Sequence, residues 1–141
     1  MSSGKVRYLR ALYEFRALSP QRAVSSNRVA KRLGVRAPTA VVMLRRLARR
    51  GLVEYEPRHG AWLTRKGIRA MRRQAWRHRV LEVFLFKELG FEREKAHRYA
   101  EAIEDAVPEE VIMKLCARLN HPQRCPCGKR IVCHCSGDGS P

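Results

Sequence analysis

Residues 36–67 read RAPTAVVMLRRLARRGLVEYEPRHGAWLTRKG, and the fold prediction starts from this stretch. Apolar side chains recur at Ala40, Leu44 and Leu47, with the i, i+4, i+7 spacing of one buried helix stripe. Pro38 suits the first turn of that helix, and Gly51 stops it after about residue 50. The stretch therefore predicts a helix followed by a two-stranded hairpin, with strands at 52–56 and 61–64 and a basic turn at 57–60.

Two more helices are predicted before this stretch. Residues 5–18 carry apolar side chains near helical spacing, and Ser19-Pro20 ends that helix. Ser25-Ser26 caps a short helix, Asn27–Leu33, which Gly34 closes. A short turn then joins it to the helix that contains the Ala40 stripe. Helix, short turn, helix and hairpin together predict a winged helix-turn-helix.

The charge of the chain is concentrated in its first half. The 141 residues carry a formal net charge of +17, of which residues 1–80 hold +18 and residues 81–141 hold −1. An excess of this size in a helix-turn-helix indicates a polyanion partner more than a solvated surface, and double-stranded DNA is the simplest one. No apolar run reaches the roughly 20 residues of a membrane span, and no secretory signal begins the chain. We therefore expect a cytoplasmic protein without a membrane partner.

The predicted recognition helix gives the candidate DNA-contacting residues. Its outward positions would face base edges in the major groove, and neighbouring arginines and Lys66 would contact phosphates, so DNA binding should fall steeply with salt. The candidates for base edges are Thr39, Val42 and Arg46, and those for the backbone and the wing are Arg28, Arg36, Arg49, Arg50 and Arg58.

The second half carries side chains of the kind that bind metal ions. A long helix that begins after its N-cap Thr64 and runs to about Leu89 places His78 and Glu82 one turn apart. A helix over about 92–107 presents more such groups on one arc. If the helices pack, nitrogen and oxygen ligands converge that suit Mn²⁺ or Fe²⁺, with Zn²⁺, Co²⁺ and Ni²⁺ as alternatives. The bland alternative is an acidic face paired with Arg or Lys in solvent. The candidate ligands are His78, Glu82, His97, Glu101, Glu104 and Asp105.

Four stretches resemble the metal-dependent repressors of the diphtheria toxin repressor and manganese transport regulator family. They are RYLRALYEF, the stretch 36–67, RHRVLEVFL and KAHRYAEAIEDAV, in family order and spacing across about residues 5–119. The resemblance implies a homodimeric transcription regulator in which Mn²⁺ or Fe²⁺ promotes operator binding, with its ligands falling on the six candidates above. The family commonly has His where this chain has Asp105.

The chain departs from the family pattern in its first helix. Arg7 and Arg10 stand where the resemblance implies metal ligands, and an arginine side chain cannot ligate a cation. One hypothesis is that Arg7 pairs with Glu101 or Glu104 as a cation substitute, which makes DNA binding partly or wholly metal-independent. The alternative is that Arg7 faces solvent or a phosphate, and that the second half alone supplies the ligands.

The end of the chain is rich in cysteine. Cys125, Cys127, Cys133 and Cys135 have the spacing C-x-C-x5-C-x-C, which can close a tetrahedral Zn²⁺ site; an Fe–S or redox role and a free or disulfide-linked tail are the alternatives. Cys116, on a predicted helix over 109–119, is expected to be a buried small apolar residue. That helix is the candidate for part of the dimer contact.

The sequence thus predicts a mainly α protein with a winged helix-turn-helix at 1–64, a helical metal-binding and dimerisation domain at 65–119 and a cysteine-rich tail at 120–141. The predicted function is metal-responsive repression of metal homeostasis genes. Two alternatives are a metal-independent regulator and a non-specific architectural DNA-binding protein. No catalytic residues and no small-molecule substrate are predicted, because neither a nucleophilic triad nor a Gly-rich phosphate loop is present.

Overall fold

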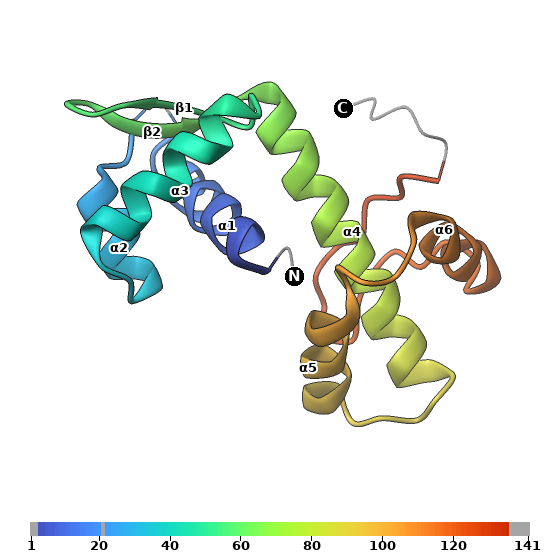
Figure 1. Ribbon diagram of the computed structural model, residues 1–141. Helices are drawn as coiled ribbons and strands as arrows, with labels where there is room; N and C mark the ends of the chain where they lie inside the picture. Colours follow the sequence, from blue (N-terminus) through green and yellow to red (C-terminus); the bar gives the residue numbers. More distant parts are fainter. Residues whose placement is uncertain (1–2, 21, 136–141) are drawn as a thin grey trace. The chain divides into compact units, whose positions relative to one another are not determined.

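The computed structural model describes residues 3–20 and 22–135, and the chain forms two compact units that divide between Met71 and Arg72. Figure 1 shows the helices of both units and the β1–β2 hairpin of the first. The first unit holds α1 (Ser3–Leu18), α2 (Ser26–Leu33), α3 (Ala37–Arg49), β1 (Val53–Glu56), β2 (Gly60–Leu63) and the start of α4 (Arg65–Lys87); the second holds the rest of α4, α5 (Arg93–Ile103) and α6 (Glu109–Arg118).

The helix-turn-helix forms as predicted. The Ser25 hydroxyl accepts a hydrogen bond from the Arg28 backbone N–H at 3.2 Å and so caps α2. Gly34 closes α2 in the left-handed conformation, with φ of 65°. The predicted stripe of α3, Ala40, Leu44 and Leu47, is buried in the core of the unit. The stripe holds α3 against α1 and α2, so its opposite side stays outside the core.

The wing is an antiparallel hairpin in which Val53 pairs with Leu63 and Glu56 pairs with Gly60. Val24, two residues before α2, adds to it, since the backbone groups of Val24 and Ala61 exchange two hydrogen bonds of 2.8 Å. A side chain at Gly60 would place its Cβ 2.4 Å from the Val24 carbonyl oxygen. This extra bridge was not predicted from the sequence, because a single paired residue leaves no periodic pattern.

The start of α4 is tied to the loop that follows α3. The Thr64 hydroxyl accepts from the Gly67 N–H at 3.0 Å, as predicted for an N-cap, and donates to the Gly51 carbonyl at 2.5 Å. Gly67 lies so close to the chain that a Cβ built on it would be 2.0 Å from the Leu52 carbonyl oxygen. The first turn of α4 therefore packs directly on backbone.

A Gly67→Ala substitution is expected to destabilise the protein by about 1–3 kcal/mol, because the added methyl group must displace backbone and not a flexible side chain. Urea unfolding followed by circular dichroism measures the loss. Gly4→Ala is the matched control, since a Cβ there meets only the end of the Met43 side chain at 3.9 Å. Equal stability of the two variants would show that Gly67 is not under this constraint.

The second unit packs α4, α5 and α6 around a core that contains Trp76, Val80 and Ile112. The helices end earlier than the sequence suggested: α4 stops at Lys87 and α5 stops at Ile103, with residues 104–106 in a turn. The residues after α6 belong to the same unit, and Cys125 and Ile131 from them are buried in its core.

Candidate metal centre

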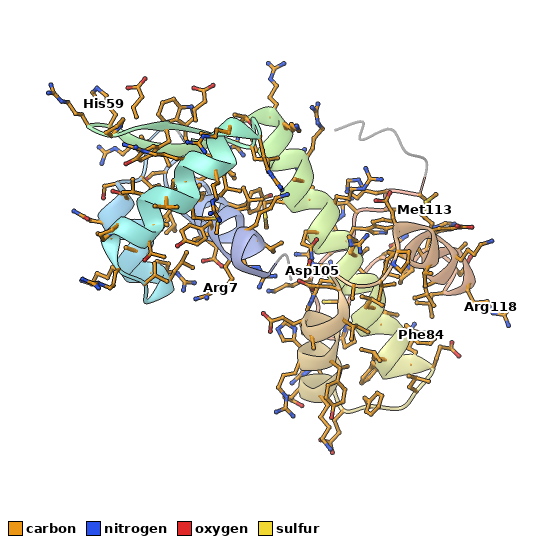
Figure 2. The ribbon with its side chains drawn as sticks, viewed as in Figure 1. Arg7, His59, Phe84, Asp105, Met113 and Arg118 are labelled. Atoms are coloured by element: carbon orange, nitrogen blue, oxygen red, sulfur yellow. The ribbon has the colours of Figure 1, made fainter. Side chains whose placement is uncertain are left out.

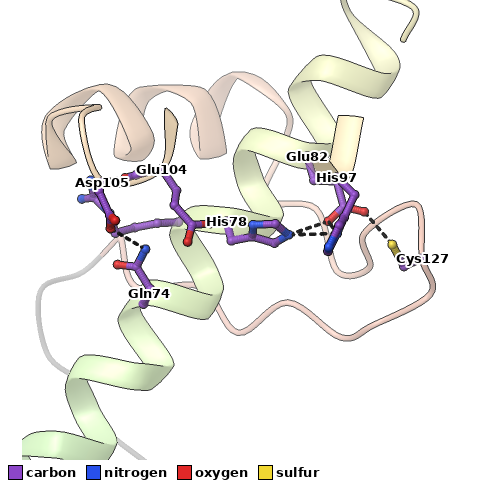
Figure 3. Close-up of polar contacts among 8 residues, drawn as sticks. Gln74, His78, Glu82, His97, Glu104, Asp105 and Cys127 are labelled. Carbon is purple, nitrogen blue, oxygen red and sulfur yellow. Dashed lines mark hydrogen bonds and ion pairs between the residues drawn. The ribbon is translucent and has the colours of Figure 1, made fainter. Parts of the chain in front are cut away.

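Three ligand-type side chains meet between α4 and α5. His78 and Glu82 lie one turn apart on α4, and His97 comes from α5, as Figure 3 shows. His78 Nε2 is 3.1 Å from Glu82 Oε2 and 3.2 Å from His97 Nδ1, and the last two atoms are 3.5 Å apart. A cation about 2.1 Å from each of three ligands would hold them about 3.0 Å apart in octahedral and about 3.4 Å apart in tetrahedral geometry. The three atoms therefore fit a single metal ion.

Buried carboxylates surround His78 on both sides. Glu82 and Glu104 have relative exposures of only 1% and 2%. The second ring nitrogen of His78, Nδ1, lies 2.5 Å from Glu104 Oε2, so Glu104 can fix the orientation of the ring that presents Nε2 to the centre. Two carboxylates in a buried position are costly unless protons or a cation neutralise them, and this favours a cation site.

The six predicted ligands do not converge on one point. Because α5 ends at Ile103, Asp105 leaves the helix arc, and its Oδ1 instead accepts a hydrogen bond of 3.0 Å from Gln74 (Figure 3). Arg77 supports this turn by donating to the carbonyl oxygens of Glu104 and Val107. Glu101 is on the exposed side of α5. The predicted continuous helix to residue 107 was wrong, and Asp105 therefore does not share the helix arc of His97 and Glu101.

Tail cysteines reach this centre, which the sequence did not indicate. The Cys127 thiol donates a hydrogen bond of 2.7 Å to Glu82 Oε1, and Cys125 lies within ligand range of the same pair. The hydrogen bond to the Glu82 carboxylate, with burial second, raises the pKa of Cys127 to about 11. Sulfur beside nitrogen and oxygen ligands widens the choice of metal toward Fe²⁺ and Zn²⁺. No periodic pattern in the tail could have revealed this contact.

The four tail cysteines divide into two pairs. Cys125 and Cys127 lie beside Glu82, whereas Cys133 and Cys135 lie beside Cys116 and His121. This differs from the single four-thiol site that their spacing suggested, because the first pair lies within a small hairpin over residues 123–131 and the second pair follows it. Cys116 is buried as expected, yet its sulfur faces the second pair.

The candidate DNA-contacting residues lie on the surface of the first unit. On α3, Val42 is 54% exposed, and the other candidates are likewise exposed. The Arg28 guanidinium stacks on the Phe15 ring, 4.9 Å from its centroid. His59 lies in the turn at the tip of the hairpin, which Figure 2 labels. The remaining candidates for base and phosphate contacts are Arg36, Thr39, Arg46, Arg49, Arg50 and Arg58.

Arg7 has a structural role within the first unit. Its guanidinium donates a hydrogen bond of 2.9 Å to the carbonyl oxygen of Leu33, the last residue of α2. A cation at a helix C-terminus satisfies an unpaired carbonyl and opposes the helix dipole. The predicted pairing of Arg7 with Glu101 or Glu104 would join the two units and stays a prediction.

Most of the chain is similar to one known family of proteins. Residues 2–61 match the N-terminal DNA binding domain of the iron dependent repressor family, and residues 64–133 match its metal binding and dimerisation domain. An uncharacterized HTH-type transcriptional regulator of Methanocaldococcus jannaschii is 30% identical over 115 residues, which make up 82% of this chain and 91% of that protein. The chain belongs to the iron dependent repressor family. The predicted family and the winged-helix fold class are thereby confirmed.

Other members of this family are longer. The transcriptional regulator MntR of Escherichia coli is 43% identical over 84 residues, which cover 60% of this chain and 54% of that protein. A manganese-dependent transcriptional repressor, solved in complex with manganese, has a TM-score of 0.72 and 34% identity; the likeness covers 92% of this chain and 62% of that one. The chain thus spans about half the length of the curated MntR. Among the described residues, no helix is long and apolar enough to cross a membrane.

Proposed function

We propose that the protein is a metal-responsive transcriptional repressor that binds operator DNA as a homodimer and controls metal homeostasis genes. The observation that carries this proposal is the cluster of His78, Glu82 and His97, whose three ligand atoms fit one cation. It stands in the same chain as a winged helix with a strongly basic sequence. The family description, metal binding and dimerisation, supports both parts of the proposal.

The regulatory cation is proposed to be Mn²⁺ or Fe²⁺. The family description names iron, a similar solved structure is a manganese-dependent repressor, and imidazole and carboxylate donors suit both ions. His78, Glu82 and His97 would hold the ion, and Glu104 would orient His78. Glu101 and Asp105 stay candidates for a further ligand role. When bound, the cation would neutralise the buried carboxylates. We propose that the protein acts by binding DNA and not as an enzyme. For the tail we also propose Zn²⁺, held by a set of ligands that differs from the four cysteines Cys125, Cys127, Cys133 and Cys135.

The winged helix is proposed to contact DNA through α3 and the hairpin tip. Thr39, Val42 and Arg46 share the outward side of α3 and would meet base edges, while the other arginines would meet phosphates. Operator affinity should fall linearly with salt on logarithmic axes, because each neutralised phosphate releases counterion. Because it binds DNA in this role, we propose that the protein is located in the cytoplasm.

Dimerisation is proposed to use the second unit, which matches the family's dimerisation domain. Apolar side chains stay exposed on and beside its helices, with Val111 of α6 43% exposed and Leu89 after α4 55% exposed. Surface of this kind is typical of subunit contacts. The helix α6 remains our candidate for part of the contact.

A second candidate function is a regulator that binds DNA without a metal switch. The hydrogen bond from Arg7 to the Leu33 carbonyl favours it, because this arginine stabilises the DNA-binding unit in a place where the family resemblance implies a ligand. In that case the cluster around Glu82 would serve stability alone.

Footprinting tests whether the protein is a regulator at all. Fragments from upstream of metal transport genes are incubated with the full chain and Mn²⁺, then digested by a nuclease. We expect one or a few short protected sites with two-fold symmetry, since a homodimer reads paired half-sites. Uniform protection along every fragment would contradict a regulator and favour an architectural protein.

A further inference from the structure

A second cluster of ligand-type side chains lies in the second unit, separate from the cluster around His78 and Glu82. Cys116 projects from α6, His121 follows that helix, and Cys133 and Cys135 come from the end of the tail. One ligand atom from each of the four residues lies within 4.8 Å of the others. None of these atoms belongs to the cluster around His78 and Glu82.

The distances match those of a tetrahedral zinc site. His121 Nδ1 lies 3.5 Å from the sulfurs of Cys116 and Cys133 and 3.7 Å from the sulfur of Cys135, and the Cys116 and Cys133 sulfurs are 3.9 Å apart. A Zn²⁺ ion with Zn–S bonds of about 2.3 Å and a Zn–N bond of about 2.0 Å holds two sulfurs about 3.8 Å apart and a nitrogen about 3.5 Å from each sulfur. A disulfide needs sulfurs about 2 Å apart, so these cysteines, all free, are not paired.

The local backbone brings the four groups together. Asn120 and His121 both adopt the left-handed conformation, with φ of 60° and 49°, which is uncommon for residues other than glycine. The His121 N–H donates to the Cys116 carbonyl at 2.8 Å, so the chain turns back over the end of α6. The Cys135 N–H donates to the Cys133 sulfur at 3.4 Å, a contact that suits a thiolate acceptor.

We propose that Cys116, His121, Cys133 and Cys135 bind one Zn²⁺ ion as a structural site, distinct from the regulatory centre. Three thiolates and one imidazole complete a tetrahedron and leave no open position, which is the arrangement of structural zinc. The proposal does not depend on the regulatory function, because it rests on the geometry of the tail alone.

The site has a consequence for the regulatory centre. Between its ligands His121 and Cys133, the chain forms a small hairpin, closed by backbone hydrogen bonds from Ile131 to Gln123 at 2.8 Å and from Cys125 to Lys129 at 2.9 Å. This hairpin places Cys127 against Glu82 at 2.7 Å. One zinc ion bound by both His121 and Cys133 restrains the segment between them, whether or not the regulatory centre holds a cation. It therefore holds Cys127 beside Glu82.

The experiment compares two double variants of the full chain. The native protein, Cys133→Ser/Cys135→Ser and the control Cys125→Ser/Cys127→Ser are dialysed against a weak chelator, and their zinc content is measured by mass spectrometry. The same proteins are then loaded with Co²⁺, whose thiolate absorption reports sulfur ligation. We expect the native and control proteins to keep the zinc of this site and its cobalt–thiolate band, and the Cys133→Ser/Cys135→Ser protein to hold about one zinc per chain less than both and to lose that band. Any other pattern overturns the proposal, including equal loss in the two variants.

A single substitution covers the case in which the double variant fails to fold. His121→Gln keeps every thiol and removes the one nitrogen ligand. Competition with a coloured zinc chelator is expected to show an affinity at least about tenfold weaker than that of the native protein. Circular dichroism checks that the variant is folded. An unchanged zinc affinity would contradict a site that uses this histidine.

Discussion

A Glu82→Gln variant is expected to lose Mn²⁺ affinity by about 100-fold or more, the largest effect of any single substitution in the metal centre. Glu82 supplies the one carboxylate of the three-residue cluster, and its Oε2 lies within 3.5 Å of ligand nitrogens from both His78 and His97. Glutamine has the same size but a neutral amide, so the site keeps its shape and loses its charge. Mn²⁺ paramagnetic resonance, in which free and bound ions differ, measures the affinity.

The control for this variant is Glu88→Gln, which removes the same charge from an exposed position just beyond the end of α4. We expect its Mn²⁺ affinity to stay within about twofold of the native value, because exposed charges are screened by solvent. The Glu82→Gln protein should remain folded, since a buried amide costs less than a buried charge. A folded Glu82→Gln protein that binds Mn²⁺ like the native chain would show that the metal centre lies elsewhere.

An Arg46→Ala variant is expected to weaken operator binding by about 1–3 kcal/mol, or roughly 10- to 100-fold. Arg46 is exposed on the side of α3 opposite the buried stripe, where Val42 is also exposed. In the major groove, an arginine there could donate two hydrogen bonds to one guanine, and alanine would make neither. Fluorescence anisotropy at fixed salt measures the loss on the footprinted operator.

Two comparisons make the Arg46 result specific. Arg93→Ala removes an exposed arginine from α5 in the other unit, away from the proposed dimer helix α6, and we expect little change in its operator affinity. On DNA of unrelated sequence, Arg46→Ala should lose much less than on the operator, because a base contact adds specificity and a phosphate contact does not. If Arg46→Ala weakens binding to both DNAs equally, Arg46 contacts the backbone and does not read bases.

The sequence predicted the first unit well because its signals are local. The spacing of Ala40, Leu44 and Leu47, the Ser25 cap and the Gly34 stop each act within one or two helix turns, and the structure confirms all of them. Helical periodicity also predicted that His78 and Glu82 share one side of α4, and these two residues do meet in the centre.

The rest of the site depends on long-range contacts that sequence periodicity does not predict. Asp105 was placed on a helix that ends at Ile103, where Arg77 from α4 supports the turn by bonding the Glu104 carbonyl. The cysteines divide between two clusters because Cys127 lies in a small hairpin and Cys133 lies after it, and no regular pattern in the tail indicates that hairpin. Such long-range contacts are decided by packing, which spacing alone cannot predict.

The most direct test of a metal-responsive repressor is operator affinity as a function of metal. The full chain is treated with chelator, and its affinity for the footprinted operator is measured before and after titration with Mn²⁺, Fe²⁺ or Zn²⁺. We predict that Mn²⁺ or Fe²⁺ raises the affinity by about 10- to 100-fold, the range of common allosteric coupling energies, and that Glu82→Gln removes the rise. Equal affinity with chelator and with every metal would contradict the metal switch and leave a metal-independent regulator.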